Sequence, residues 1–391
     1  MFQATLKSNG DQPIVFLKGR IDSSNASQAE QQIRDLIPED ARALALDAGE
    51  LAYISSAGLR VVLRLKKMIP DTRIVNVNSD VYEIFDMTGF TEMMDIVKAY
   101  RQLSVEGCEV IGEGANGKVY RIDGDTIVKV YKNRDALEEI HNERELARKA
   151  FVMGIPTAIP YDVVQVGDLY GSVFELLDAK SFAKLIAAAP EKTADYARQS
   201  AEILKTMHQT MLEPGELPDK KQEALVWANF CVEHLPQDVG AKLVELVRAI
   251  PDTRNMLHGD FHVKNIMQQN GENLLIDMDT LSMGHPVFEF AAIYAAYIGF
   301  SCVDRLNVTK FLGLTPEQAA IFWETTLDAY FDGDQAKIAQ VKRAAPVICY
   351  ARLLRRTMRR HNADDPHYGD MIEFCKQYLI DEVPKIDTLS F

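Results

Sequence analysis

The chain has 391 residues, of which 47% are hydrophobic and 26% are charged. A chain of this length and mix can bury the cores of two or three globular domains, which excludes a disordered tail, a collagen and a small disulfide scaffold. The formal net charge is −14. Binding to nucleic acid or to anionic lipid would therefore need a local basic patch.

The first residues, MFQATLKSNGDQP, lack the apolar core of a secretory signal. The longest apolar run, at about 290–300, is shorter than the ~20 residues that span a bilayer. The five cysteines form no C-x-x-C pair, which is typical of reduced thiols. We therefore expect a cytoplasmic protein with no membrane span and no nucleic-acid partner.

Residues 1–100 have the pattern of a small α/β domain. Apolar strands are expected at 13–17, 43–47 and 73–77, and a helix at about 26–37. Strands that alternate with helices of ten or more residues indicate a mixed or parallel sheet covered by helices.

Two serines, Ser55 and Ser56, stand where a strand-like stretch ends and the next helix begins. Serines at a helix N-terminus cap free amides, and the same place favours an anion such as phosphate. The segment 51–63, with GRID before it and IFDMTGF after it, resembles a STAS domain, the module of anti-sigma-factor antagonists and sulfate transporters. The resemblance covers about residues 3–98. It implies that Ser56 corresponds to a serine whose phosphorylation switches partner binding. This chain has Ser55 where the family usually has an aspartate, so either hydroxyl is a candidate phosphosite.

A second domain is expected from residue 106. Its first strand leads into a G-x-G-x-x-G loop that contains Gly112, Gly114 and Gly117, and the chain then continues as a strand. That order favours a kinase nucleotide loop over a dinucleotide-binding turn, which would open a helix. The glycines allow backbone amides to approach phosphate oxygens.

Lys129 follows in a strand of alternating apolar residues. In the helix expected at 137–151, Glu143 shares a face with Ile140 and Ala147 by helical spacing. Glu143 is therefore the favoured ion-pair partner of Lys129, and Glu145 is the alternative.

The strongest signal is MLHGDFHVKNIM at 256–267, followed by LLIDMD at 274–279. Phosphoryl transfer needs a carboxylate beside the acceptor hydroxyl, oxygen ligands for Mg²⁺ and positive groups on the phosphates. Asp260 and Asn265 have the spacing of the base and the asparagine in a kinase catalytic loop. Asp277, at the end of an apolar strand, has the place of a second oxygen ligand for the metal.

Residues ~107–380 resemble the aminoglycoside phosphotransferase and choline kinase branch of the protein-kinase-like fold. The signature of that branch is H-G-D-x-H-x-x-N-I followed by I-D-x-D. The resemblance implies that Asp260 is the catalytic base and that Lys129 orients the α- and β-phosphates of ATP. It also implies that Asn265 and Asp277 hold Mg²⁺. Glu289 stands where relatives have an aspartate, and we interpret it as a structural hydrogen-bonding residue.

The predicted architecture is an α/β STAS domain at 1–100 followed by an α+β bilobal kinase-like domain. The N-lobe, at 106–180, carries the glycine loop and an interlobe strand, and the mainly helical C-lobe, at 181–391, carries the catalytic loop. The interlobe strand is expected in YGSVFELLD at 170–178. The resemblance implies that its backbone near Glu175 and Leu177 binds adenine.

These features predict an ATP- and Mg²⁺-dependent phosphotransferase that acts on a hydroxyl of a small molecule or of a protein serine. The STAS module would regulate it and contact a protein partner. The alternative is a nucleotide-sensing regulatory or scaffold protein of an anti-sigma-type pathway, with little catalysis and Ser56 as a phosphoswitch. An arginine-rich stretch at 352–360 is either a solvated helix face or an anion-binding or docking surface.

Overall fold

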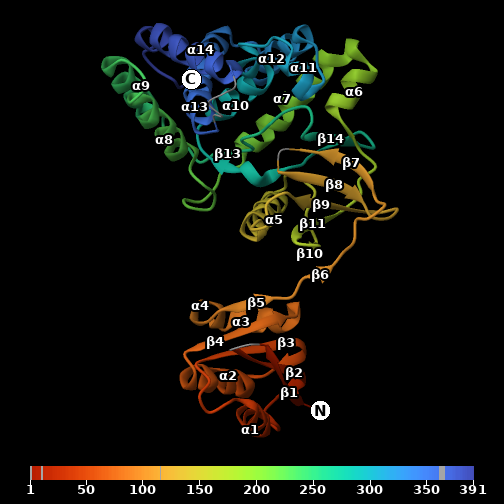
Figure 1. Ribbon diagram of the computed structural model, residues 1–391. Coiled ribbons are helices and arrows are strands. Elements are labelled where there is room, and N and C mark those ends of the chain that lie inside the picture. The colour runs from red at the N-terminus through yellow and green to blue at the C-terminus, as the bar shows by residue number, and fades with distance from the viewer. Residues whose placement is uncertain (1, 10–11, 115, 361–365) are drawn as a thin grey trace. The chain divides into compact units, whose positions relative to one another are not determined.

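The computed structural model describes residues 2–9, 12–114, 116–360 and 366–391. The chain divides into two compact units (Figure 1). The first unit comprises Met1–Gly107 and Val163–Gly171, and the second comprises Cys108–Asp162 and Ser172–Phe391.

The first unit contains a mixed sheet with the strand order β1-β2-β3-β4-β5. β1 and β2 are antiparallel, and the other neighbours are parallel. The prediction of an α/β domain with a mixed sheet and helices is confirmed. Its elements are β1 (Gln3–Asn9), β2 (Gln12–Ile21), α1 (Ala26–Leu36), β3 (Ala43–Ile54), α2 (Ser56–Met68), β4 (Asp71–Val77), α3 (Ser79–Met87), α4 (Phe90–Met93) and β5 (Ile96–Lys98).

Helix α2 packs on this sheet through residues at helical spacing. Leu59, Val62 and Leu65 are buried, so they form its apolar face. Gly58 lets the start of the helix approach the strands, because a Cβ there would lie 2.6 Å from Ile54 Cγ1 and 2.8 Å from Ile21 Cγ2. The N-terminus of α2 is thus held close to the ends of β2 and β3.

The second unit begins with antiparallel strands that carry the glycine loop. These strands belong to a sheet with the order β6-β10-β11-β9-β8-β7, of which β6 and residues 163–171 of β10 and β11 are counted with the first unit. Its elements and the helix between them are β6 (Arg101–Gln102), β7 (Glu109–Glu113), β8 (Gly117–Arg121), β9 (Thr126–Tyr131), α5 (Leu137–Val152), β10 (Asp162–Val166) and β11 (Leu169–Glu175).

The rest of the second unit is mainly helical, as predicted (Figure 1). Short antiparallel strands pair as β12-β14-β15 and β13-β16. These strands are β12 (Lys180–Ser181), β13 (Met256–Leu257), β14 (Ile266–Gln269), β15 (Glu272–Leu275) and β16 (Ser282–Met283). The α-helices are α6 (Phe182–Ala188), α7 (Thr193–Gln209), α8 (Lys220–Val232), α9 (Gln237–Ala249), α10 (Val287–Tyr297), α11 (Asn307–Leu312), α12 (Pro316–Tyr330), α13 (Gln335–Arg360) and α14 (Pro366–Glu382). The 3₁₀ turns are η1 (Pro190–Lys192), η2 (Met278–Thr280), η3 (Gly299–Ser301) and η4 (Val383–Lys385).

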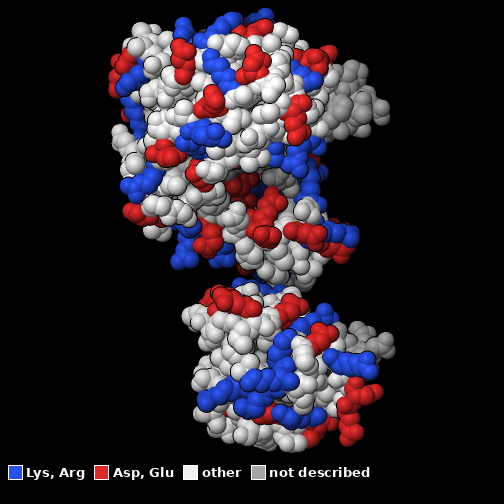
Figure 2. All heavy atoms as spheres, turned by 90° about the vertical axis from the view of Figure 1, so that its left-hand side faces the viewer, with Lys and Arg blue, Asp and Glu red and all other residues white. Residues whose placement is uncertain are grey.

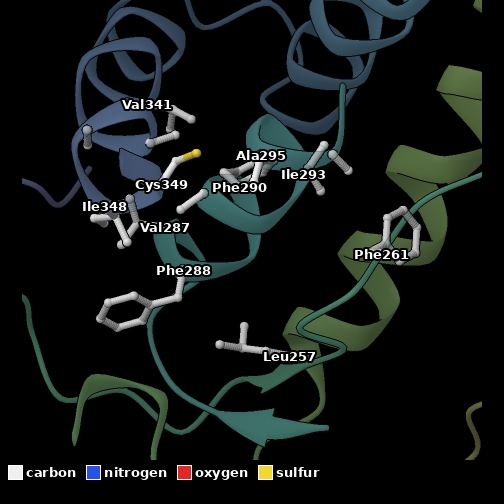
Figure 3. Close-up of a cluster of buried hydrophobic side chains, with 14 of the residues drawn as sticks. Leu257, Phe261, Val287, Phe288, Phe290, Ile293, Ala295, Val341, Ile348 and Cys349 are labelled. Atoms are coloured by element: carbon white, nitrogen blue, oxygen red, sulfur yellow. The ribbon is translucent and has the colours of Figure 1, made fainter. Parts of the chain in front are cut away.

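Helix α10 lies at the centre of the helical core. Its residues are apolar on nearly all sides, which is typical of a helix that is buried all round. Ile348 and Cys349 of α13 pack with Phe290 in the same buried cluster (Figure 3). The hydroxyl of Tyr297, at the end of α10, accepts a hydrogen bond of 3.1 Å from the Val263 amide. The core therefore supports the segment 258–265 directly.

The five cysteines are free thiols. A search of the described ranges for a helix long and apolar enough to cross a membrane finds none.

Candidate active site

Lys129 lies on β9, and its ammonium group bridges two carboxylates. Nζ is 2.9 Å from Glu143 Oε1 on α5 and 3.0 Å from Asp277 Oδ1. Of the two glutamates considered, Glu143 is buried and pairs with Lys129, whereas Glu145 is exposed. Burial lowers the pKa of Lys129, but the charges of Asp277 and Glu143 outweigh burial and raise that pKa. The ammonium group therefore stays charged at neutral pH.

Tyr131 completes this cluster, and the sequence analysis missed it. Its hydroxyl donates a hydrogen bond to Glu143 Oε2. Side chains two residues apart on a strand point to one face, so the spacing from Lys129 was the signal that could have found it. The bond orients the Glu143 carboxylate toward Lys129.

The loop that carries Asp260 is held by a buried carboxylate. Glu289 is fully buried, and its carboxylate accepts the amides of His258 (2.5 Å) and Gly259 (3.1 Å). Burial raises the pKa of Glu289, but nearby His208 and the contacts with His258 outweigh burial, so the pKa lies below its usual value. Glu289 is thus an ionised structural residue of the loop.

His258 joins two segments of the site. Its Nε2 is 3.2 Å from the Ile276 carbonyl, and its Nδ1 accepts the Asp260 amide at 3.3 Å. Gly259 has a φ of +82°, and a Cβ there would lie 2.6 Å from the Thr280 carbonyl oxygen. A side chain at this position would push the Asp260 loop away from η2.

Asp260 is the carboxylate at the tip of this loop, and almost half of its side chain is exposed. Its Oδ2 lies 3.5 Å from Nε2 of the buried His262. Burial raises the pKa of Asp260, but His262, His258 and the charge of Arg352 outweigh burial and hold the pKa at about 2. Asp260 is therefore ionised at neutral pH and can accept a hydrogen bond.

Asn265 is buried beside Asp260. Its side-chain nitrogen donates to the Asp260 carbonyl at 3.0 Å, which turns the side-chain oxygen to the opposite side of the amide group. Its backbone carbonyl accepts the Ile276 amide at 3.0 Å, so Asn265 is tied to the strand that leads to Asp277.

Asp277 and Asp279 follow β15. Asp277 has a left-handed backbone with a φ of +65°, a conformation that aspartate tolerates better than most residues. Asp279, which is half-buried, has a pKa raised to about 7 by burial and by the charge of Asp277, and Lys129 partly opposes this shift. The charges of Glu143 and Asp260 act on it as well.

This donor set fits a divalent cation. The carboxylates of Glu143, Asp260, Asp277 and Asp279 outnumber the single ammonium group of Lys129. The raised pKa of Asp279 reflects this surplus of negative charge. Asp277 and Asn265 offer the hard oxygen atoms that Mg²⁺ prefers. In the described parts of the chain, no three His, Cys, Asp or Glu side chains are grouped to hold a metal by themselves. Mg²⁺ is commonly held by one or two side chains together with phosphates and water.

The glycines of the loop between β7 and β8 have different roles. Gly114 has open space where a Cβ would be, so its backbone can be approached closely. Gly117 is a packing residue, because a Cβ there would lie 2.4 Å from the Val130 carbonyl oxygen on β9. Gly112 lies within β7, and residue 115 is outside the described residues.

The predicted adenine segment follows β11. Glu175 ends that strand and is exposed, and Leu177 is half-buried in the connection to β12. Between them, the Leu176 amide donates to the Asp125 carbonyl at 2.7 Å, which fixes this connection to the turn between β8 and β9.

In the first unit, the two serines have different environments. Ser55 is the N-cap of α2, and its hydroxyl accepts the Gly58 amide at 3.4 Å. Ser56 is the first helical residue and is exposed. Its carbonyl accepts the Arg60 guanidinium at 3.1 Å. The capping bond therefore uses Ser55 and leaves the Ser56 hydroxyl at the surface.

Comparison with known proteins agrees with both resemblances. Residues 107–330 match the family model described as the phosphotransferase enzyme family, and residues 3–104 match the STAS domain model. The chain is 33% identical over 90 residues to a putative anti-sigma factor antagonist, BtrV, of Bordetella bronchiseptica, covering 22% of this chain and 78% of that protein.

Among solved structures, the similar ones include aminoglycoside phosphotransferases. A GDP complex of aminoglycoside 2'-phosphotransferase-IIIa has a TM-score of 0.49 and 13% identity, covering 78% of this chain and 98% of that one. A ternary complex of a related enzyme with ADP and hygromycin B has a TM-score of 0.49 and 14% identity, covering 77% and 98%. Because these scores lie below 0.5, the family assignment depends on the family models.

The raised pKa of Asp279 predicts a pH dependence of stability. Its pKa is about 7 in the folded chain and ~3.9 in an unfolded chain. Between these values the folded state binds more protons, so stability falls as the pH rises from about 4 to 7. Asp279→Asn should remove this loss of stability. The urea concentration at the unfolding midpoint of the variant should therefore fall less as the pH rises over that range. Replacing the exposed Asp328 by Asn is the matched control, and equal slopes in all three proteins would contradict the prediction.

Proposed function

The chain belongs to the phosphotransferase enzyme family and carries a STAS domain, and on this basis we propose that it transfers the γ-phosphoryl group of ATP to a hydroxyl group. The observation that carries the proposal is that Lys129 is ion-paired with both Glu143 and Asp277. Asp260 and Asn265 are tied to the strand that leads to Asp277. This is the set of groups that phosphoryl transfer needs.

In this reaction the acceptor oxygen forms a bond to the γ-phosphorus, and the bond between that phosphorus and the leaving ADP oxygen breaks. The Asp260 carboxylate orients the acceptor hydroxyl and takes its proton, which passes on to water. Lys129 contacts the α- and β-phosphates, and the loop around Gly114 approaches them through its backbone. Asn265 and Asp277 would hold Mg²⁺, which when bound neutralises charge on the phosphates.

Glu143 acts on the nucleotide through Lys129. The carboxylate fixes the ammonium group, and Tyr131 fixes the carboxylate. Without this pairing, Lys129 would retain Asp277 as its partner and would compete with the metal for that carboxylate.

Asp260→Asn should lower the rate of ADP release by about 10²–10⁴-fold, because the variant lacks the base. ATP binding should persist, because the lysine and its partners are unchanged. The measurement is a coupled ADP-release assay beside a nucleotide titration. Turnover that is unimpaired in this variant would contradict the role of Asp260.

Glu143→Gln should lower kcat/KM for ATP by about 10- to 100-fold, the range expected for loss of a charged hydrogen bond. Glu145→Gln is the matched control, since it makes the same change two residues away on the exposed side of α5. It should stay within about twofold of the unmodified protein. Equal losses in the two variants would contradict the assignment of Glu143.

The second candidate function is a phosphoswitch in the STAS domain, favoured by the exposed hydroxyl of Ser56. The similarity to a putative anti-sigma factor antagonist supports a protein partner for this domain. A phosphate on Ser56 would add about −1.5 to −2 charges at the N-terminus of α2, beside Arg60. Such a change would alter the surface that a partner meets.

Intact mass after incubation with ATP and Mg²⁺ tests whether the chain modifies this serine itself. If the chain is its own substrate, it gains one phosphoryl group that is lost in Ser56→Ala and kept in Ser55→Ala, because Ser55 is used as the helix cap. Asp260→Asn controls for phosphorylation by a contaminant. A gain that survives Ser56→Ala, or no gain at all, would rule out Ser56 as a substrate of its own chain.

A further inference from the structure

Arg352 on α13 is a charged residue that has no role in the reaction proposed above. Its side chain is half-buried, and its guanidinium carbon lies 5.5 Å from the centre of the Trp227 ring on α8. Among the described residues, no carboxylate forms an ion pair with Arg352. A guanidinium that is partly withdrawn from water and is not held in a direct ion pair favours binding of an anion from solution.

Helix α13 is packed tightly against the turn that follows α10. A Cβ on Gly299 would lie 2.6 Å from Cys349 Sγ on α13, so only a glycine allows this approach. One helical turn after Arg352, the Arg356 guanidinium lies 5.1 Å from the Phe300 ring centre. The stretch of α13 that carries both arginines is therefore fixed against η3.

A line of rings connects η3 to Asp260. The centres of the Phe300 and Phe311 rings are 6.1 Å apart, and the His262 ring lies 5.1 Å from Phe311. His262 in turn lies 3.5 Å from the Asp260 carboxylate. Arg352, one turn before Arg356 on the same stretch of α13, is one of the charges that lower the pKa of Asp260. The arginine thus belongs to the surroundings of the reacting groups.

The two sides of Asp260 differ in charge. Asn265 links Asp260 to the segment of Asp277 and Lys129, where carboxylates are in surplus. On the His262 side, Lys264 lies 5.8 Å from the Phe311 ring, and α13 brings Arg352 and Arg356. Figure 2 shows a recess in the second unit with acidic side chains inside it and basic side chains along one margin. The nucleotide and its metal suit the acidic side, which leaves the basic side for the acceptor.

We propose that the phosphoryl acceptor is a small hydroxyl compound that carries a carboxylate or phosphate group, and that Arg352 binds this group while Asp260 faces the hydroxyl. The inference rests on the proposed phosphotransferase function. A guanidinium can give two parallel hydrogen bonds to either anion, which positions the rest of the molecule. A cationic acceptor would instead bring like charges together beside Arg352.

Trp227 provides a direct readout of binding. The chain has two tryptophans, and Trp323 is buried beside Tyr294, so Trp323→Phe leaves Trp227 as the single indole. We would titrate this full-length variant with glycerol 3-phosphate and with glycerate at constant ionic strength. A saturable change in emission is expected with at least one of them, and the two arms distinguish phosphate from carboxylate. Glycerol and choline, the neutral and cationic controls, should give no saturable change.

Arg352→Gln, in the same background, should abolish the response. Arg343→Gln is the matched control, because Arg343 is exposed and lies nine residues earlier on α13, about half a revolution around the helix. The control should respond as the parent does. A response that persists in Arg352→Gln, or that glycerol and choline produce equally, would overturn the proposal.

ADP release with the same four compounds provides an independent measurement. The anionic acceptor should be turned over best, and Arg352→Gln should raise its KM by about 10- to 100-fold while KM for ATP is unchanged. Faster turnover of the neutral or cationic compound, or a loss confined to kcat, would overturn the proposal and leave the phosphotransferase function standing. An emission response without ADP release from any of the four compounds would mean that the anion site at Arg352 does not serve the acceptor, and it would overturn the proposal while leaving the phosphotransferase function standing.

Discussion

The site depends on the ion pairs that the ammonium group of Lys129 makes with two carboxylates. The ammonium group joins β9 to α5 through Glu143, 14 residues away in the chain, and to the segment after β15 through Asp277, 148 residues away. Removing Lys129 would leave the buried carboxylate of Glu143 without its counter-charge, at a cost of about 3–5 kcal/mol. The ion pairs therefore hold the strands of the glycine loop in a fixed position relative to the segment that carries the proposed metal ligand Asp277.

A second buried charge organises the other half of the site. Glu289 is enclosed in the helical core, yet it stays ionised because backbone amides and histidines surround it. Through this carboxylate, helix α10 positions the loop of Asp260. Gly259 allows this arrangement, since the contact with Thr280 leaves no room for a side chain. The carboxylate that we propose as the catalytic base is thus located by the core.

Charge is also divided around Asp260. Glu143 and Asp277 pair with Lys129, and α13 carries Arg352 and Arg356, so Asp260 has the proposed nucleotide site and the proposed anion site as its neighbours. In the first unit, the neighbouring serines Ser55 and Ser56 have different environments. One serine satisfies the helix N-terminus, and the next keeps its hydroxyl exposed.

The sequence by itself determined the fold class of both domains, because helical spacing, strand alternation and glycine turns are local properties. It also predicted a site in the Asp260 loop, since the chemistry of phosphoryl transfer needs a fixed spacing along the chain. It could not choose between Glu143 and Glu145 beyond a preference, or find that Gly117 is needed for strand packing. Those depend on which face of α5 is covered and how closely β8 approaches β9. The position of Arg352 beside Trp227 was likewise decided by the tertiary structure, because contacts between residues far apart in the chain follow from how the helices pack.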